Sequence, residues 1–125
     1  MTMKVDGLIV SNTSKSRPNT LLSPHKIEIG GLSGRPIKDI AHRTLHQVYQ
    51  LTSGTIPIVG VGGIESGNDA YQRIRAGASL IEIYTAMTFH GPGLIQTMKR
   101  DLDACLERDG FNSVSEAVGA DHRRV

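Results

Sequence analysis

Three short apolar runs divide the chain, and each is followed by a more polar segment. The runs are Asp6–Val10 (DGLIV), Ile56–Val61 (IPIVGV) and Ser79–Tyr84 (SLIEIY). Each is too short for a buried helix and contains isoleucine or valine, residues that favour extended backbone. We therefore expect three buried strands.

Apolar residues recur at helical spacing between these runs. After Pro36, which suits the first turn of a helix, they repeat every three or four residues until Gly54, a natural stop. Ser66 and Asp69 form an S-x-x-D start for a helix over Gly67–Ala76. The pattern therefore predicts one helix between each pair of neighbouring strands.

Further helices are expected after the third run. A turn or two of helix follows it directly, and Pro92 then opens a longer helix that stops at Gly110. Ser113 and Glu116 fit a second capping box, which starts a short helix over Val114–Val118. The chain is thus expected to end in helices that follow the last strand.

The order strand–loop–helix–strand–helix–strand–helix predicts an α/β fold with parallel strands and right-handed crossovers. Three such units cannot close a barrel. The strands near Leu8 and Ile81 would keep unpaired edges, and one face of the sheet would lack a packing partner. We therefore interpret residues 1–125 as the carboxyl-terminal part, about three βα units, of a (β/α)8 barrel truncated at its amino end.

The stretch between the first strand and Gly34 has no regular period. Pro18, Pro24 and Gly30 interrupt it. A loop of this length in a compact domain is usually functional or mobile.

Composition excludes several functions. A net charge of +2 and an aromatic content of 4% do not favour nucleic acid as a partner. Cys105 is the only cysteine, so an internal disulfide is impossible, and no apolar run approaches the ~20 residues of a membrane span. The amino terminus has no signal-peptide pattern.

Glycines follow the second strand where a phosphate site is expected. Gly62 and Gly63 lack side chains, which lets backbone N–H groups approach an anion, and Tyr84 and Thr85 occupy the matching position after the third strand. Barrels commonly bind phosphate with the loops after their last two strands. The alternative is that these glycines only permit tight turns.

Two other phosphate motifs fit less well. Counting from Gly60, a Walker loop needs its second glycine, and a dinucleotide fingerprint its third, where Glu65 stands. Glu82 does lie about twenty residues on, as a ribose-binding acid would, so the dinucleotide interpretation is weakened without being excluded.

Polar residues also follow the first strand. Ser11, Asn12 and Thr13 offer an amide and two hydroxyls, which suit a planar ligand with carbonyl and N–H edges. The same residues routinely form turns, and composition alone favours the turn.

Several motifs together resemble dihydroorotate dehydrogenase, in its membrane-associated, quinone-dependent class (class 2). They are DGLIVSNT, SRP, GGLSGRPI, IPIVGVGGIESG, IRAGASLIEIYTA and GADHRR, and they run along essentially the whole chain. The resemblance implies a (β/α)8 barrel that oxidises dihydroorotate to orotate with FMN, in pyrimidine biosynthesis, and passes electrons to ubiquinone.

The resemblance also implies roles for particular residues. Asn12 and Thr13 match residues that hold the orotate ring. The residues that match contacts to FMN are Ser11, Ser33, Gly34, Gly62, Gly63, Tyr84 and Thr85, of which the last four form the phosphate cradle.

The departures from the family are equally informative. No segment matches the strands that supply the catalytic serine and a lysine beside the flavin, nor the amino-terminal helices that reach the membrane. We therefore expect negligible turnover from this chain alone. The family implies the inner mitochondrial membrane in eukaryotes and the cytoplasmic membrane in bacteria. The alternatives are a non-catalytic phosphate-binding half-barrel that dimerises, or a different FMN barrel.

Other candidates are weaker. His42 and His46 have metal-ligand spacing on one helix, but no third ligand is evident, so a solvated helix face is the favoured interpretation. Arg123 and Arg124 are interpreted as a charged tail. Glu65 and Glu82 are not favoured as general bases, and Cys105 is expected to be packed or partly exposed.

Overall fold

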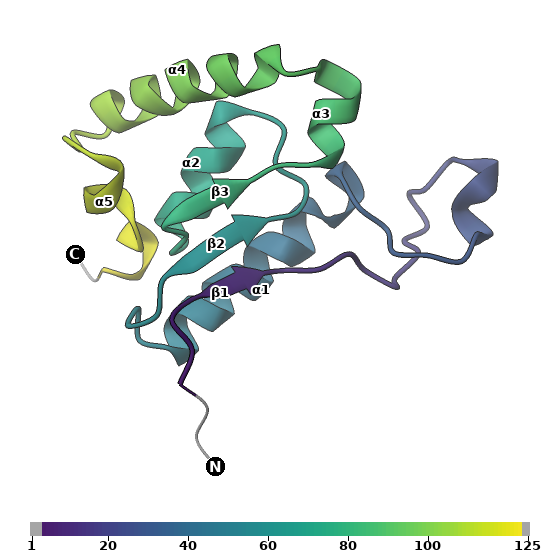
Figure 1. Ribbon diagram of the computed structural model, residues 1–125, viewed down its shortest axis with the longest axis horizontal. Helices are drawn as coiled ribbons and strands as arrows, with labels where there is room; N and C mark the ends of the chain where they lie inside the picture. The colour runs from purple at the N-terminus through teal and green to yellow at the C-terminus, as the bar shows by residue number, and fades with distance from the viewer. Residues whose placement is uncertain (1–3, 124–125) are drawn as a thin grey trace.

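A computed structural model describes residues 4–123. The three expected strands form one parallel sheet in the order β1 (Leu8–Val10), β2 (Ile58–Val61) and β3 (Leu80–Glu82) (Figure 1). Each strand is shorter than the apolar run that predicted it. At the start of β2 the reason is local, because Pro57 has no N–H for the ladder and contributes only its carbonyl, which accepts from the Leu8 N–H at 2.9 Å.

The helices also lie where the pattern placed them, and their bounds are α1 (Lys38–Leu51), α2 (Gly67–Arg75), α3 (Thr85–His90), α4 (Gly93–Arg108) and α5 (Val114–Ala117). Pro36 belongs to a 3-10 turn, Arg35–Ile37, that precedes α1 rather than to the first turn of the α-helix. Further 3-10 turns occur at Pro24–Ile27 and Ala120–His122.

Serine caps fix two of the helix starts as predicted. The Ser66 hydroxyl accepts from the Asp69 N–H at 3.1 Å, and the Ser113 hydroxyl accepts from the Glu116 N–H at 3.3 Å. Each bond satisfies an N–H that has no partner within its helix.

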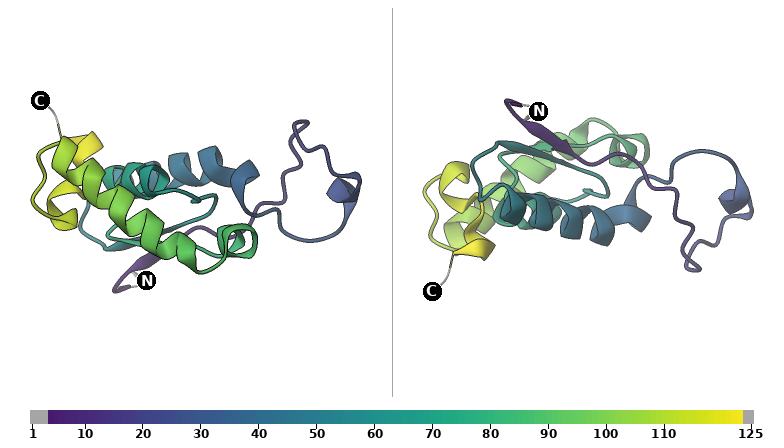
Figure 2. Two further views of the ribbon diagram at one scale, coloured as in Figure 1. Left: turned by 90° about the horizontal axis from the view of Figure 1, so that it is seen from above. Right: turned by 90° about the horizontal axis from the view of Figure 1, so that it is seen from below.

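The core lies between the sheet and the helices. Figure 2 shows α1 and α2 on the same side of the sheet. Leu45 of α1 packs there with Val10 and Ile58, while Tyr71 and Ile74 of α2 pack against α4 and α5. Cys105 of α4 is buried in this second cluster, in agreement with the sequence interpretation.

The opposite face of the sheet is uncovered within residues 4–123. The register aligns Ile9 with Val59 and Val59 with Leu80, so these three side chains share one face. Ile9 is 68% exposed and Leu80 is 65% exposed, whereas Ile58 on the covered face is 0% exposed. The expected sheet face without a packing partner is therefore present.

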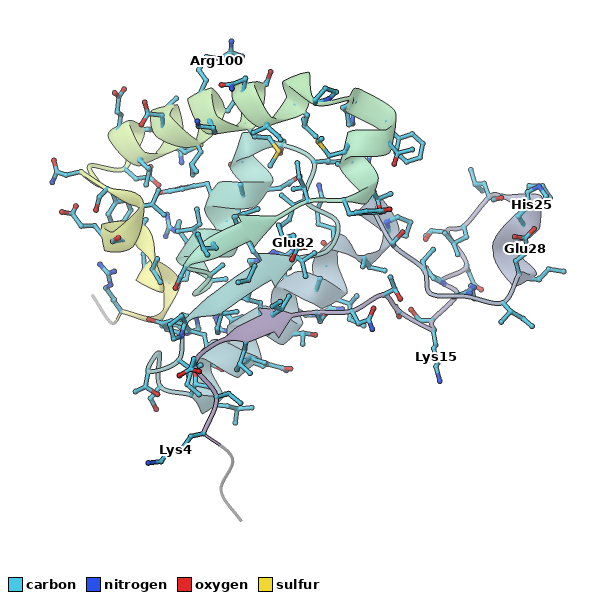
Figure 3. All side chains as sticks on the ribbon, viewed as in Figure 1. Lys4, Lys15, His25, Glu28, Glu82 and Arg100 are labelled. Atoms are coloured by element: carbon cyan, nitrogen blue, oxygen red, sulfur yellow. The ribbon has the colours of Figure 1, made fainter. Side chains whose placement is uncertain are left out.

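The segment between β1 and α1 is more ordered than its sequence suggested. It projects from the sheet (Figures 1 and 3), and Figure 3 shows His25 and Glu28 together at its far end. The Arg17 guanidinium donates to the carbonyls of Lys26 at 2.9 Å, Glu28 at 3.0 Å and Gly30 at 2.7 Å. The Arg17 side chain thus stabilises the loop by bonding to the backbone carbonyls of the loop.

Candidate functional site

A pocket of about 690 Å³ lies at the carboxyl ends of the three strands, at the right-hand ends of the arrows in Figure 1. All nine residues predicted for substrate or cofactor line it, and they come from four separate segments: Ser11, Asn12, Thr13, Ser33, Gly34, Gly62, Gly63, Tyr84 and Thr85. Parallel strands place the loops at their carboxyl ends on one side of the sheet, which brings these segments together.

The turn after β2 requires glycine, because of its backbone conformation and because neighbouring atoms leave no room for a side chain. Gly62 has φ +106° and Gly63 has φ +71°, and a Cβ on Gly63 would lie 2.5 Å from the Lys38 Cα at the start of α1. Turn geometry alone therefore explains both glycines. The Gly63 N–H makes no hydrogen bond within residues 4–123, so this donor is free for a ligand.

A second contact joins the loop before α1 to the end of β3. The Thr85 hydroxyl donates to the Ser33 hydroxyl at 3.0 Å. Gly34, with φ +72°, lies so close that a Cβ there would be 2.9 Å from the Thr85 Cγ2. Hydroxyl groups from the loop before α1 and from the start of α3 thus meet at the pocket wall.

The polar residues after β1 form part of the pocket wall. The Asn12 side-chain carbonyl accepts from the N–H of the adjacent Thr13 at 2.7 Å, and the backbone of residues 11–13 forms no turn, so the turn that composition favoured is absent there. Ser14 and Leu32 then pair through their backbones at 2.9 and 2.7 Å, closing the base of the projecting loop. The Asn12 amide nitrogen makes no hydrogen bond within the described residues and faces no competing partner there.

Ion pairs surround the start of α1. Lys38 Nζ lies 3.0 Å from the Asp69 carboxylate and 3.6 Å from Glu65, which also pairs with Arg35 at 2.7 Å. Burial would raise the pKa of Asp69, but hydrogen bonds from Lys38, the Glu65 N–H and Ser66 hold that pKa below its usual value. Asp69 therefore remains ionised, and its bonds to Lys38 and to the Glu65 N–H hold the start of α2 against the start of α1.

Arg73 is a residue that sequence reasoning missed. It is 2% exposed on the inner side of α2, and its Nη2 donates to the carbonyls of Gly62 at 2.9 Å and Lys38 at 3.3 Å. Burial lowers the pKa of Arg73 to about 10, and the charge of Asp69 opposes that shift. The available signal was Gly60, a glycine inside a β-branched strand, which marks a close approach by another group.

Two of the weaker candidates need correction. His42 and His46 are half-buried, and the His46 ring centroid lies 4.0 Å from that of His122, so a solvated helix face is wrong. Burial, followed by the charges of Arg73 and His46, lowers the pKa of His42. No group of three or more metal-ligating side chains occurs among residues 4–123.

The terminal arginine pair also differs from expectation in its described member. Arg123 donates to the backbone carbonyls of Glu116 and Val118, so it closes the turn after α5 instead of forming a solvated tail. Arg124 lies outside the described residues. Glu65 and Glu82 both line the pocket, Glu65 in its ion pairs and Glu82 at the carboxyl end of β3 (Figure 3).

Parallel βα units with a ligand pocket at their strand ends define a segment of an α/β barrel. A family model described as dihydroorotate dehydrogenase matches residues 1–106. The chain therefore belongs to the dihydroorotate dehydrogenase family, a family of oxidoreductases, which confirms the sequence resemblance and removes the alternative of a different FMN barrel.

Individual relatives support the same family membership. Mouse mitochondrial dihydroorotate dehydrogenase (quinone) is 52% identical over 96% of this chain and 30% of its own length. The enzyme of the same name from Rhodospirillum rubrum is 56% identical over 95% of this chain and 32% of its own. A crystal structure of DHODH from Eimeria tenella in complex with ferulenol superposes with a TM-score of 0.93 at 47% identity, covering 96% of this chain and 32% of that one. The chain thus spans about a third of the length of these relatives.

Among the helices of residues 4–123, none is both long enough and apolar enough to span a bilayer.

Proposed function

We propose that this segment forms the phosphate end of an FMN site and part of an orotate site. In the whole protein, the reaction would be oxidation of dihydroorotate to orotate in pyrimidine biosynthesis, with a quinone as electron acceptor. The observation that carries the proposal is the convergence of nine residues, selected from the sequence alone, on one pocket of about 690 Å³. The names of the relatives support the substrate and the acceptor.

The chemistry of the pocket fits a phosphate group. The Gly63 N–H makes no hydrogen bond within residues 4–123, and Ser33 and Thr85, whose hydroxyls are bonded to each other, line the same pocket. A Cβ on Gly63 would collide with the Lys38 backbone, so the glycine lets the turn pack closely against the start of α1. These donors would hold the phosphate, and bound FMN supplies the capacity to accept a hydride and release electrons one at a time.

The other end of the pocket fits a planar ligand with carbonyl groups. Asn12 keeps its amide N–H donors free within the described residues, and Thr13 adds a hydroxyl at the same strand end. We assign both to the orotate ring. No residue of this chain is assigned the proton-accepting role, so we expect negligible turnover by the 125-residue chain and propose that strands outside it supply the base. Membrane association, at the mitochondrial inner membrane or the bacterial cytoplasmic membrane, would likewise depend on regions outside this chain.

The uncovered sheet face favours a second candidate, a non-catalytic phosphate-binding module that pairs with a copy of itself. Ile9 and Leu80 are exposed on that face, and such apolar surface tends to be covered in solution. Size-exclusion chromatography distinguishes the candidates. A defined dimer supports the module, and aggregation or chaperone dependence supports a segment that needs the rest of its barrel.

Flavin binding tests the main proposal. FMN is titrated into the purified chain and followed by fluorescence, with Gly63→Ala as the test variant. Gly91→Ala is the matched control, because Gly91 also has a positive φ of +69° but a Cβ there meets nothing within 4 Å. We expect saturable binding that weakens at least about tenfold, ~1.4 kcal/mol, in Gly63→Ala only. A folded chain that binds no FMN would overturn the assignment of this pocket as a self-sufficient phosphate site.

A further inference from the structure

A buried, charged side chain lies directly behind the glycine turn. The Arg73 stem packs against β2, where a Cβ on Gly60 would lie 2.6 Å from the Arg73 Cγ. The guanidinium is enclosed, and its Nε and Nη1 atoms make no hydrogen bond within residues 4–123. Burying a charge without a hydrogen-bonded carboxylate is costly, so this arrangement needs a compensating role.

The hydrogen bond from Arg73 sets the direction of one peptide group. Arg73 Nη2 donates to the Gly62 carbonyl at 2.9 Å, so this oxygen points toward α2. The peptide bond between Gly62 and Gly63 is trans, and in a trans peptide the carbonyl and the following N–H point in opposite directions. The Gly63 N–H therefore points away from Arg73, and Gly63 itself lines the pocket.

Of Arg35, Lys38 and Arg73, only Arg73 has no direct carboxylate partner among residues 4–123. Arg35 and Lys38 are held by Glu65 and Asp69. Asp69 acts on Arg73 only through space, because its carboxylate is already bonded to Lys38 and to the Glu65 N–H. Glu82 lines the pocket from β3 and disfavours an anion, which makes the buried cation the more important.

We propose that Arg73 is a positioning residue for the phosphate group, which orients the Gly62–Gly63 peptide and makes the pocket select a phosphomonoester over the same ligand without phosphate. This inference rests on the proposed function. It predicts that Arg73 controls the ratio of FMN affinity to riboflavin affinity. A merely structural tie between α2, the start of α1 and β2 would change stability and leave that ratio unaltered.

The test measures FMN and riboflavin binding to the full 125-residue chain by fluorescence titration. Arg73→Met removes the charge and keeps a linear apolar stem against Gly60, and Arg73→Lys keeps the charge. Arg43→Met is the control, because Arg43 is exposed on α1 and the substitution removes the same charge. Circular dichroism and thermal melting verify that each variant folds. If Arg73→Met does not fold, Arg73→Lys and the control decide the outcome.

We expect Arg73→Met to lower the FMN-to-riboflavin ratio about tenfold or more, since charge-assisted hydrogen bonds and charge are both lost. Arg73→Lys should recover part of this loss, because its ammonium restores charge without the planar fork, and Arg43→Met should leave the ratio unchanged. An unaltered ratio in folded Arg73→Met would overturn the inference and leave the flavin proposal standing. If Arg73→Met does not fold, an unaltered ratio in both Arg73→Lys and Arg43→Met would have the same meaning.

A second measurement separates the two proposals. The Gly63 amide resonance is followed in ¹⁵N–¹H spectra during titration with inorganic phosphate. If the folded wild-type chain binds no FMN, the pocket is not a self-sufficient flavin site, and the inference on Arg73 is then decided by phosphate alone. A saturable shift in the wild type that disappears in an Arg73 variant supports it. The absence of any shift in the wild type overturns it.

Discussion

The Thr85 hydroxyl donates a hydrogen bond of 3.0 Å to the Ser33 hydroxyl, although 52 positions separate these residues in the sequence. The bond joins the start of α3 to the loop that precedes α1, and it closes one side of the pocket. Gly34 allows this approach, because it has no side chain and adopts a positive φ of +72°. The start of α3 and the loop before α1 therefore form one wall, whose shape depends on a residue without a Cβ.

Gly34→Ala tests this wall. A Cβ would lie 2.9 Å from the Thr85 Cγ2 and would also strain the backbone, so we expect unfolding to become easier by about 1–3 kcal/mol and FMN binding to weaken. Gly93→Ala is the control, because a Cβ at that position meets nothing within 4 Å and its φ is not positive. Urea unfolding and FMN titration provide the two measurements. Equal behaviour of the two variants would show that the contact between Thr85 and Ser33 does not shape the pocket.

We expect Asp69 to contribute a part of the folding stability that is lost at acidic pH. Its pKa is lowered in the folded chain, against burial, by hydrogen bonds from Lys38, the Glu65 N–H and Ser66. The unfolded state therefore binds the proton more tightly, so the stabilisation is fully present above the unfolded pKa of about 3.9 and is lost as pH falls through the folded pKa. Asp69→Asn should remove about 1–3 kcal/mol near neutral pH and make the acid limb shallower.

The measurement is urea unfolding at a series of pH values between neutral and strongly acidic. The difference between wild type and Asp69→Asn should be constant above the unfolded pKa and shrink below it. Asp103→Asn, at an exposed position on α4, should run parallel to the wild type. A difference that grows as the pH falls would contradict the lowered pKa of Asp69 in the folded chain.

Local signals predicted much of this fold, and non-local contacts account for what they missed. Apolar runs, capping serines and glycines at helix ends are signals that span only a few residues. The strands, helices and caps of the structure lie where these signals predicted them. The role of Arg73 depends instead on Gly60 and Gly62 of β2 and its following turn, which helical periodicity does not reveal. The conformation of the projecting loop likewise depends on hydrogen bonds from Arg17 to carbonyls 9 to 13 residues away.

The pocket was predictable for a related reason. Its residues follow strand ends, and parallel strands collect such positions at one edge whatever the details of packing. The stacking of His46 on His122 was not predictable, because it requires the carboxyl-terminal turn to fold back onto α1. The lack of a third ligand favoured a solvated helix face for His42 and His46, and only the tertiary contact shows otherwise.

Tyr49 of α1 occupies a slot lined by glycines. A Cβ on Gly54 would lie 2.7 Å from the Tyr49 hydroxyl, and a Cβ on Gly77 or Gly119 would also collide with the Tyr49 side chain. Gly119 precedes the turn whose His122 ring lies 4.6 Å from the Tyr49 ring. The tyrosine therefore holds the carboxyl-terminal segment against α1.

Gly119→Ala should destabilise the chain through both the collision and its positive φ of +69°. In a Tyr49→Ala background only the backbone strain remains, so the cost of Gly119→Ala should fall. We expect a coupling of about 1 kcal/mol or more between the two positions in a double-mutant cycle measured by urea unfolding. Simple additivity would mean that the segment is held by other contacts.

The uncovered sheet face leads to the last prediction. Ile9 and Leu80 are 68% and 65% exposed there, whereas Ile58 on the covered face is 0% exposed. Replacing Ile9 and Leu80 together with threonine places a β-branched residue at each position and removes apolar surface. We expect the free energy of unfolding to change by no more than about 0.5 kcal/mol and self-association to decrease in sedimentation experiments.

Ile58→Thr introduces the same residue on the covered face and serves as the comparison. It should cost about 2–4 kcal/mol, because it leaves a cavity and buries a hydroxyl. If the Ile9 and Leu80 substitutions destabilise the chain as strongly as Ile58→Thr, the open face is covered in solution by a second copy, because a bare face contributes nothing to stability. That result would favour the dimerising module over a barrel segment that needs further strands to cover its sheet.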